Sequence, residues 1–154
     1  MRLTEKPEIV TWPETHYLYI EKTGPFQDTA GPAWKTLHQL VPKILERNKI
    51  TGYMSLYKIA PAMIYRAGVA VSAKPTEIPS VLQYIKFQGG KYSRFVLNGP
   101  YANLPKASRR VMEIVEEKKM KLRDDFYIEN YVNDPRTTPE EDLKIGRASC
   151  RERV

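Results

Sequence analysis

The feature that most constrains this chain is an internal repeat. Residues 17–41 align with residues 92–116 at an offset of 75 positions, and both copies contain a Gly-Pro-aromatic step, Gly24-Pro25-Phe26 and Gly99-Pro100-Tyr101. Further along, the offset becomes 74 and three more pairs match: Tyr53 with Tyr127, Tyr57 with Tyr131, and Pro61 with Pro135. A unit that occurs twice is expected to form the same local structure twice.

The first pseudo-repeat, about residues 8–75, is predicted to form a strand, a Gly-Pro turn, a helix and two further strands. Residues 16–23 alternate between apolar and polar side chains, which is typical of a half-buried strand. Residues 29–47 place apolar side chains at helical spacing. Residues 51–59 and 64–71 are rich in β-branched and aromatic residues and are predicted to be strands.

The second pseudo-repeat, about residues 76–144, is predicted to follow the same order. Residues 81–87 and 91–98 are expected to pair as a hairpin across a Gly-Gly step. A helix over 104–120 and a strand over 125–132 follow. The predicted fold class is therefore α+β: duplicated strand-helix-strand-strand units, with an antiparallel sheet, two helices on one face and a ligand cleft between the halves.

Composition excludes several classes of protein. The chain has 154 residues, 25 Lys and Arg against 18 Asp and Glu, and a single cysteine, so we expect neither a disulfide framework nor a cysteine-rich metal site. No apolar run is long enough for a membrane helix, and the N-terminus has no signal-peptide pattern, which predicts a cytoplasmic protein. The two histidines, His16 and His38, lack metal-ligand spacing, and no nucleotide-binding fingerprint occurs, so we expect no metal and no cofactor.

Tyrosine recurs at alternate positions of the predicted strands, where alternate residues share a face. The apolar sets expected to face the helices are Leu18/Ile20, Met54/Leu56, Phe95/Leu97 and Ile128/Val132. The sets expected on the opposite face are Tyr17/Tyr19/Glu21, Tyr53/Ser55/Tyr57, Tyr92/Arg94 and Tyr127/Glu129/Tyr131. Seven of the ten tyrosines would then lie on one face, together with two carboxylates.

An aromatic surface with few fixed negative charges suits flat, lipophilic and often cationic ligands. A partly buried Glu129 is costly to ionise without a partner, and a ligand cation can supply that partner. The bland alternative is that tyrosine, with its high β propensity, simply coats a solvated sheet. The predicted ligand-binding residues are Glu129, Tyr131, Tyr127, Tyr57, Tyr53, Tyr19, Tyr17, Tyr92 and Trp34.

Three segments carry a family resemblance: Tyr17–Phe26, Tyr92–Tyr101 and Ile128–Pro135 resemble the corresponding motifs of the GyrI-like domain. The resemblance spans about residues 8–144. It implies a small-molecule-binding domain of bacterial type, which serves as the effector-binding half of multidrug-responsive MerR- and AraC-type regulators and also occurs alone. In the family, the acid at the position of Glu129 is the usual contact for cationic drugs. Some stand-alone members hydrolyse cyclopropane-bearing toxins with that Glu and nearby tyrosines.

The chain departs from the family pattern in two places. It shows no helix-turn-helix before the first predicted strand, so we expect no direct binding of nucleic acid. The family's final strand would follow residue 144, but residues 145–154 resemble the translation of a sequencing-library adapter. We therefore expect residues 1–144 to be the domain, residues 145–154 to be an artefact, and the final strand to be missing. Its loss would expose a strand edge and destabilise the chain.

The sequence leaves three functions open. The favoured one is a stand-alone binding module, whose partner regulator is unknown. The second is a hydrolase in which Glu129 acts as general base or electrostatic stabiliser and Tyr131 or Tyr57 donates a proton. The third is a nucleic-acid binder using an aromatic sheet, which the two carboxylates on that face disfavour. The basic run over 118–123 is better explained as a solvated helix end than as a nucleic-acid site.

Overall fold

The structure is a computed structural model of the 154-residue chain. It describes residues 2–122, 126–132, 137–139, 141 and 143–150, and for residues 145–150 it describes the backbone only. The chain divides into two compact units. The central unit is Pro13–Gly89, and the terminal unit combines Met1–Trp12 with Gly90–Val154.

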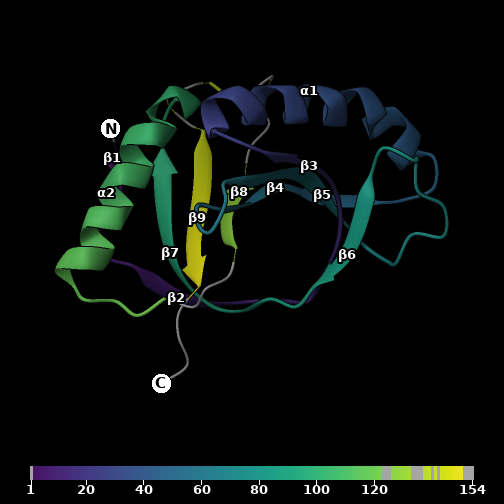
Figure 1. Ribbon diagram of the computed structural model, residues 1–154. Helices are drawn as coiled ribbons and strands as arrows, with labels where there is room; N and C mark the ends of the chain where they lie inside the picture. Colours follow the sequence, from purple (N-terminus) through teal and green to yellow (C-terminus); the bar gives the residue numbers. More distant parts are fainter. Residues whose placement is uncertain (1, 123–125, 133–136, 140, 142, 151–154) are drawn as a thin grey trace. The chain divides into compact units, whose positions relative to one another are not determined.

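The central unit is a four-stranded antiparallel sheet with one long helix, α1 (Figure 1). The sheet has the order β4-β5-β3-β6. The elements in chain order are β3 (Thr15–Thr23), α1 (Phe26–Leu45), β4 (Ile50–Lys58), β5 (Ile64–Val71) and β6 (Gln83–Phe87). The predicted succession of strand, helix, strand and strand is confirmed.

Local sequence explains how α1 begins and packs. Gly24 has φ +134°, a conformation that side-chain-bearing residues rarely adopt, and Pro25 directly precedes the helix. Ala33, Leu37 and Ile44 are almost fully buried and lie at helical spacing along the face that packs on β3 and β5. The apolar stripe thus fixes which flank of α1 lies over the sheet.

The terminal unit is also an antiparallel sheet with one α-helix. In this sheet β7 pairs with β1 and β2 along one edge and with β9 along the other, and β9 pairs with β8. Its elements are β1 (Arg2–Leu3), β2 (Glu8–Trp12), β7 (Gly90–Asn98), η1 (Tyr101–Asn103), α2 (Leu104–Glu117), β8 (Tyr127–Tyr131) and β9 (Lys144–Cys150). The mixed α+β class with antiparallel sheets is therefore confirmed, whereas a ligand cleft between the halves stays a prediction.

The predicted hairpin over 81–87 and 91–98 is wrong. β6 pairs with β3, and β7 pairs with strands of the terminal unit instead. Gly89 and Gly90 have φ values of 73° and 122°, so the chain changes direction there, but it passes from one unit to the other. A Gly-Gly step favours a turn without specifying which strand each arm pairs with.

The expectation that the final strand is missing is also wrong. Lys144–Cys150 forms β9, which pairs with β7 from Tyr92 to Asn98 and with β8 from Ile128 to Tyr131. The backbone of this segment therefore occupies a central position in the terminal sheet. The artificial origin of residues 145–154 stays a prediction.

Hydrogen bonds tie the N-terminal segment to β7 and α2 within the terminal unit. The backbone N–H of Val96 donates to Thr4 Oγ1 at 2.8 Å, and the Thr4 N–H donates to the Val96 carbonyl at 2.9 Å. On α2, Arg110 donates to Glu5, Glu113 and Glu117. These carboxylates, Glu5 first, raise the pKa of Arg110 above its ordinary value.

Candidate functional site

In the central unit, the strand register divides the predicted tyrosine face. Leu18 of β3 and Tyr53 of β4 are both Cα partners of Val69 in β5. Directly paired residues project to the same face, so Tyr53 and, four positions on, Tyr57 share the helix-covered face with Leu18. The expectation that Tyr53 and Tyr57 lie opposite Leu18 is wrong.

The other face carries Tyr17 and Tyr19. Tyr19 and Met54 are both partners of Gly68, so the tyrosines of β3 lie with the apolar residues of β4. Alternation within one strand predicts which residues share a face, but it does not give the register between strands. That register is what separates Tyr17 and Tyr19 from Tyr53 and Tyr57.

Six rings of α1, β4 and β5 form a connected cluster on the helix-covered face, called here the aromatic group. Phe26 packs against Tyr57 and Tyr65 with ring centroids 5.3 and 5.7 Å apart. Farther along the helix, His38 lies between Trp34 and Tyr53, at 5.7 and 6.3 Å. The members of the aromatic group are Phe26, Trp34, His38, Tyr53, Tyr57 and Tyr65.

A hydrogen bond joins the two parts of the aromatic group. The indole N–H of Trp34 donates to the hydroxyl oxygen of Tyr65 at 2.7 Å. Tyr57 and Tyr65 are buried cross-strand partners, Trp34 and Tyr53 are half-buried, and His38 is exposed. The cluster therefore runs from the core of the unit to its surface.

On the opposite face, Tyr17 is fixed by packing and hydrogen bonding. Its ring lies against Gly68, and its hydroxyl donates to the Met54 carbonyl at 2.8 Å. Tyr19 stacks on Tyr17, and the Arg66 guanidinium lies 4.6 Å from the centre of the Tyr19 ring. Arg66 in turn donates to Glu21 at 2.8 Å. These contacts join the strands of the sheet to one another.

Because Tyr17 and Tyr19 are buried, the stability of the folded chain depends on pH in the alkaline range. Loss of solvation raises the pKa of Tyr17 well above its ordinary value and also raises that of Tyr19. In the unfolded chain both phenols begin to ionise near pH 10, while in the folded chain Tyr17 stays neutral and Tyr19 ionises at a higher pH. Stability is therefore complete below pH 10 and falls above it, by about 1.4 kcal/mol per pH unit for the buried Tyr17. Chemical denaturation between pH 8 and 11.5 measures this slope, and Tyr17→Phe is expected to make it shallower.

In the terminal unit, the strand register also puts Glu129 on a different face of the sheet from the one predicted. Phe95 and Glu129 are both Cα partners of position 147 in β9, so their side chains share one face. Phe95 packs with Val111 and Ile114 of α2, which makes this the helix-covered face. The expectation that Ile128 lies on the helix-covered face is therefore wrong. Tyr127 and Tyr131 alternate with Ile128 and so share the face of Glu129.

Glu129 is buried, with 8% of its surface exposed, and the Tyr131 hydroxyl donates to its Oε2 at 3.3 Å. Tyr131 packs against the cluster of Leu97 and Ala107, and its ring centre is 5.7 Å from that of Tyr101. Glu129, Tyr131 and Tyr101 are called here the carboxylate group. A buried carboxylate beside aromatic rings can serve as a counter-ion for a cation or accept a proton.

The structure thus sorts the predicted ligand residues into separate sets. Trp34, Tyr53 and Tyr57 are together in the central unit. Glu129 and Tyr131 are in contact in the terminal unit, and Tyr127 shares their face. The predicted residues that lie on the opposite faces of their sheets are Tyr17, Tyr19 and Tyr92.

Sequence reasoning missed Phe26, His38, Tyr65 and Tyr101. Phe26 and Tyr101 occupy equivalent places in the Gly-Pro-aromatic steps, so the repeat itself contained the signal for them. His38 lies one helical turn after Trp34, on the same flank of α1. Tyr65 is identifiable only from the register, as the partner of Tyr57.

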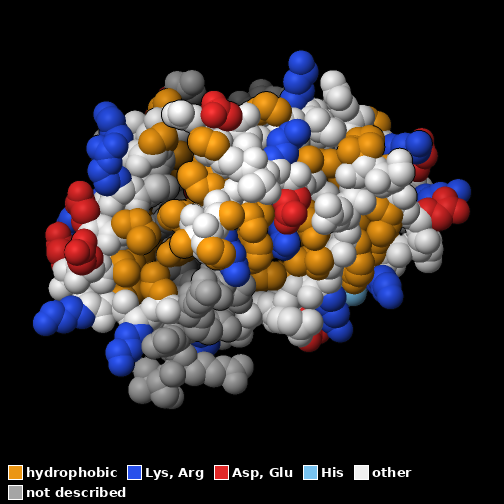
Figure 2. Space-filling model, in the orientation of Figure 1, with side chains coloured by type: hydrophobic (Ala, Val, Ile, Leu, Met, Phe, Trp, Pro, Cys, Tyr) orange, Lys and Arg blue, Asp and Glu red, His pale blue; other side chains and the backbone are white. Residues whose placement is uncertain are grey.

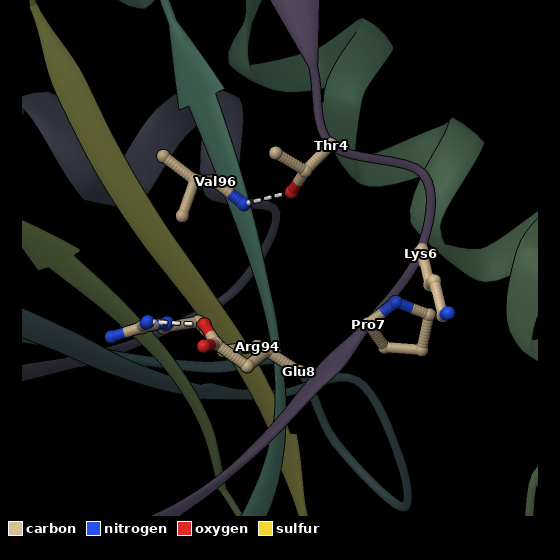
Figure 3. A pocket seen from close by; sticks show the side chains of 6 residues that line it. All are labelled: Thr4, Lys6, Pro7, Glu8, Arg94 and Val96. Atoms are coloured by element: carbon tan, nitrogen blue, oxygen red, sulfur yellow. Dashed lines mark hydrogen bonds and ion pairs between the residues drawn. The ribbon is translucent and has the colours of Figure 1, made fainter.

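A depression of about 330 Å³ in the terminal unit lies elsewhere (Figure 3). Arg94 and Glu8 form an ion pair on one wall, and Thr4 accepts the Val96 N–H on another. None of the predicted ligand residues lines it. Hydrophobic side chains also reach the surface at several places among the charged ones (Figure 2).

Within the described part of the chain, no helix combines the length and hydropathy needed to cross a membrane. Among the same residues, no three His, Cys, Asp or Glu side chains gather closely enough to hold a metal ion.

Comparison with known structures gives the fold independently. The EcmrR C-terminal domain is 16% identical, with both chains fully covered and a TM-score of 0.81. In a cryo-EM structure of the EcmrR–DNA complex, this chain covers 58% of the EcmrR chain. SAV2435 bound to tetraphenylphosphonium is 15% identical, with 94% of this chain and 93% of that one covered and a TM-score of 0.73.

A hydrolase from Listeria innocua encoded by lin2189 is 13% identical, with 94% of this chain and 91% of that one covered and a TM-score of 0.61. No curated protein sequence matches the chain. The family model of the GyrI-like small molecule binding domain matches residues 5–146. By this match, the chain belongs to the GyrI-like small-molecule-binding family.

Proposed function

We propose that this GyrI-like domain binds lipophilic, often cationic, small molecules, with Glu129 supplying the negative charge and aromatic side chains supplying flat apolar contacts. The proposed contacts form two sets, each within its own unit: Glu129, Tyr131 and Tyr127 in the terminal unit, and Trp34, Tyr53 and Tyr57 in the central unit. The proposal sets Tyr17, Tyr19 and Tyr92 aside, because each lies on the face of its sheet opposite to those residues.

The burial of Glu129 is the observation that carries the proposal. A carboxylate that is 8% exposed has lost most of its hydration, and the Tyr131 hydroxyl donates to it at 3.3 Å. A cation brought close to such a group gains more than it would beside a solvated carboxylate, because the local dielectric constant is lower. The site therefore favours a ligand that carries a positive charge.

The aromatic side chains favour a flat or aryl-bearing ligand. Each ring offers a large apolar area and a negative π face, which together attract lipophilic cations by about 0.5–2 kcal/mol per ring beyond the burial of area. SAV2435, which shares the fold, has been solved with tetraphenylphosphonium, an aryl cation of this class. EcmrR, which has the same fold in its C-terminal domain, has been solved with DNA. A role as the ligand-sensing part of a regulator in the cytoplasm, with an unidentified partner, belongs to the same proposal.

Calorimetric titration with tetraphenylphosphonium, and with tetraphenylborate as an anion of the same shape, tests the role of charge. We expect the cation to bind more tightly than the anion. We also expect Glu129→Gln to weaken binding of the cation about tenfold or more, which is equivalent to about 1.4 kcal/mol. Glu116→Gln, the same substitution at an exposed position of α2, is the matched control and is expected to bind like the unmodified protein. Equal affinity of Glu129→Gln and Glu116→Gln for the cation would remove Glu129 from the site.

The contact between Tyr131 and Glu129 also supports an alternative, a hydrolase of electrophilic compounds such as cyclopropane-bearing toxins. In this scheme Glu129 accepts a proton from the attacking water, and Tyr131 donates one to the carbon released when the strained ring opens. Steady-state product formation that disappears in Glu129→Gln supports the hydrolase. Saturable binding with unchanged ligand after prolonged incubation supports the binding module.

A further inference from the structure

The hydrogen bond between Trp34 and Tyr65 restrains the indole ring at the edge of the aromatic group. Tyr65 is 6% exposed on β5, and Phe26 packs against its ring at 5.7 Å. Its hydroxyl oxygen accepts the indole N–H at 2.7 Å. A buried tyrosine held by neighbouring rings is thus a rigid anchor for the half-buried tryptophan.

The restrained tryptophan is the first of a row of rings that reaches the surface. His38 lies 5.7 Å from Trp34, one helical turn along α1, and Tyr53 lies 6.3 Å beyond His38. All three have exposed or half-buried side chains. An aryl substituent that stacks on such a row gains most when the rings are already fixed, because no side-chain entropy is lost on binding.

We propose that Tyr65 is a positioning residue: by fixing the Trp34 ring, it makes Trp34 the stacking platform for an aryl group and sets a preference for aryl over alkyl cations. This inference rests on the proposed function, and it concerns only the contacts that the aromatic group of the central unit makes with an aryl group. The sequence gives no hint of it, since Tyr65 lies 31 positions from Trp34 along the chain.

A double-mutant cycle with two cations of equal charge tests the proposal. Tyr65→Phe keeps the buried ring and removes the hydroxyl, and Trp34→Phe removes the indole. We expect Tyr65→Phe to weaken the binding of tetraphenylphosphonium about three- to tenfold, as expected for losing one hydrogen bond. We expect the affinity for tetrabutylphosphonium to change by no more than about twofold. In the Trp34→Phe background, Tyr65→Phe is expected to have no further effect on either cation.

Tyr84→Phe is the matched control. The Tyr84 hydroxyl is also in a 2.7 Å hydrogen bond, with His16 Nδ1 in the same sheet, but it lies outside the aromatic group. Tyr84→Phe is expected to leave the ratio of the affinities for the aryl and alkyl cations unchanged. In a Trp12→Phe background, where Trp34 is the remaining tryptophan, Tyr65→Phe is also expected to lower the fluorescence anisotropy of Trp34.

The outcomes separate the two proposals. Suppose that the unmodified protein binds tetraphenylphosphonium. If Tyr65→Phe then lowers the affinity for both cations equally, or lowers it by the same factor with Trp34 and with Phe at position 34, the positioning role is wrong and the proposed function stands. If the unmodified protein binds neither cation, both proposals fall. A fall in the aryl-to-alkyl ratio that requires Trp34 supports the positioning role.

Discussion

Ending the chain after Leu143 is expected to abolish cooperative folding of the terminal unit. The truncation removes β9, which pairs with β7 on one side and β8 on the other. Each lost backbone hydrogen bond contributes about 0.5–1.5 kcal/mol, and the sum over two ladders approaches the 5–15 kcal/mol that stabilises a typical domain. Two unpaired strand edges also become templates for association.

Thermal unfolding followed by circular dichroism, together with size-exclusion chromatography, measures the effect. The control ends after Cys150 and keeps all of β9, and we expect it to unfold as the full chain does. A truncated chain that stays monomeric and unfolds at the temperature of the control would show that β9 contributes nothing to the sheet. The experiment also decides whether residues 145–150 have a structural role, whatever their origin.

Gly68→Ala is expected to be strongly destabilising. A Cβ atom at this position would lie 2.4 Å from Cζ of Tyr17 and 2.5 Å from the backbone oxygen of Leu18. The Tyr17 hydroxyl is bonded to the Met54 carbonyl and its ring is fully buried, so the ring has no room to move away. Overpacking of this kind costs about 1–3 kcal/mol or more, and we expect a loss of about 3 kcal/mol and a fall in Tm of about 6–12 °C.

Gly52→Ala in β4 is the matched control, because a Cβ there meets nothing within 4 Å. Urea denaturation of both variants gives the difference in the free energy of unfolding. Similar midpoints for the two would contradict the close packing of Tyr17 on Gly68. Both variants are expected to keep the secondary structure measured by far-ultraviolet circular dichroism at low temperature.

Much of the fold could be predicted because its determinants are local. The strand over 64–71 matches β5 at both ends, and the predicted first helix differs from α1 by a few residues at each end. Apolar periodicity and the Gly-Pro steps fix such elements without reference to distant contacts. Strand partners are set by distant contacts, and so the pairing of β6 with β3 was missed. β9 was missed for another reason, because residues 145–154 were interpreted as an artefact.

The candidate site was predictable only in part for the same reason. Trp34, Tyr53, Glu129 and Tyr131 were identified from composition, repeat and family pattern. Their sorting onto faces depends on register, and one shift of register moves every side chain of a strand to the other face. Tyr65 became visible only when β4 and β5 were aligned through Tyr57.

The route of the chain has a consequence for biosynthesis. Residues 13–89 form the central unit as one uninterrupted stretch, so its helix and its four strands are all synthesised before β7, β8 and β9. The terminal unit uses β1 and β2 from the beginning of the chain and β9 from its far end. On the ribosome β1 and β2 must therefore wait until β7 and β9 have left the exit tunnel before this half can assemble.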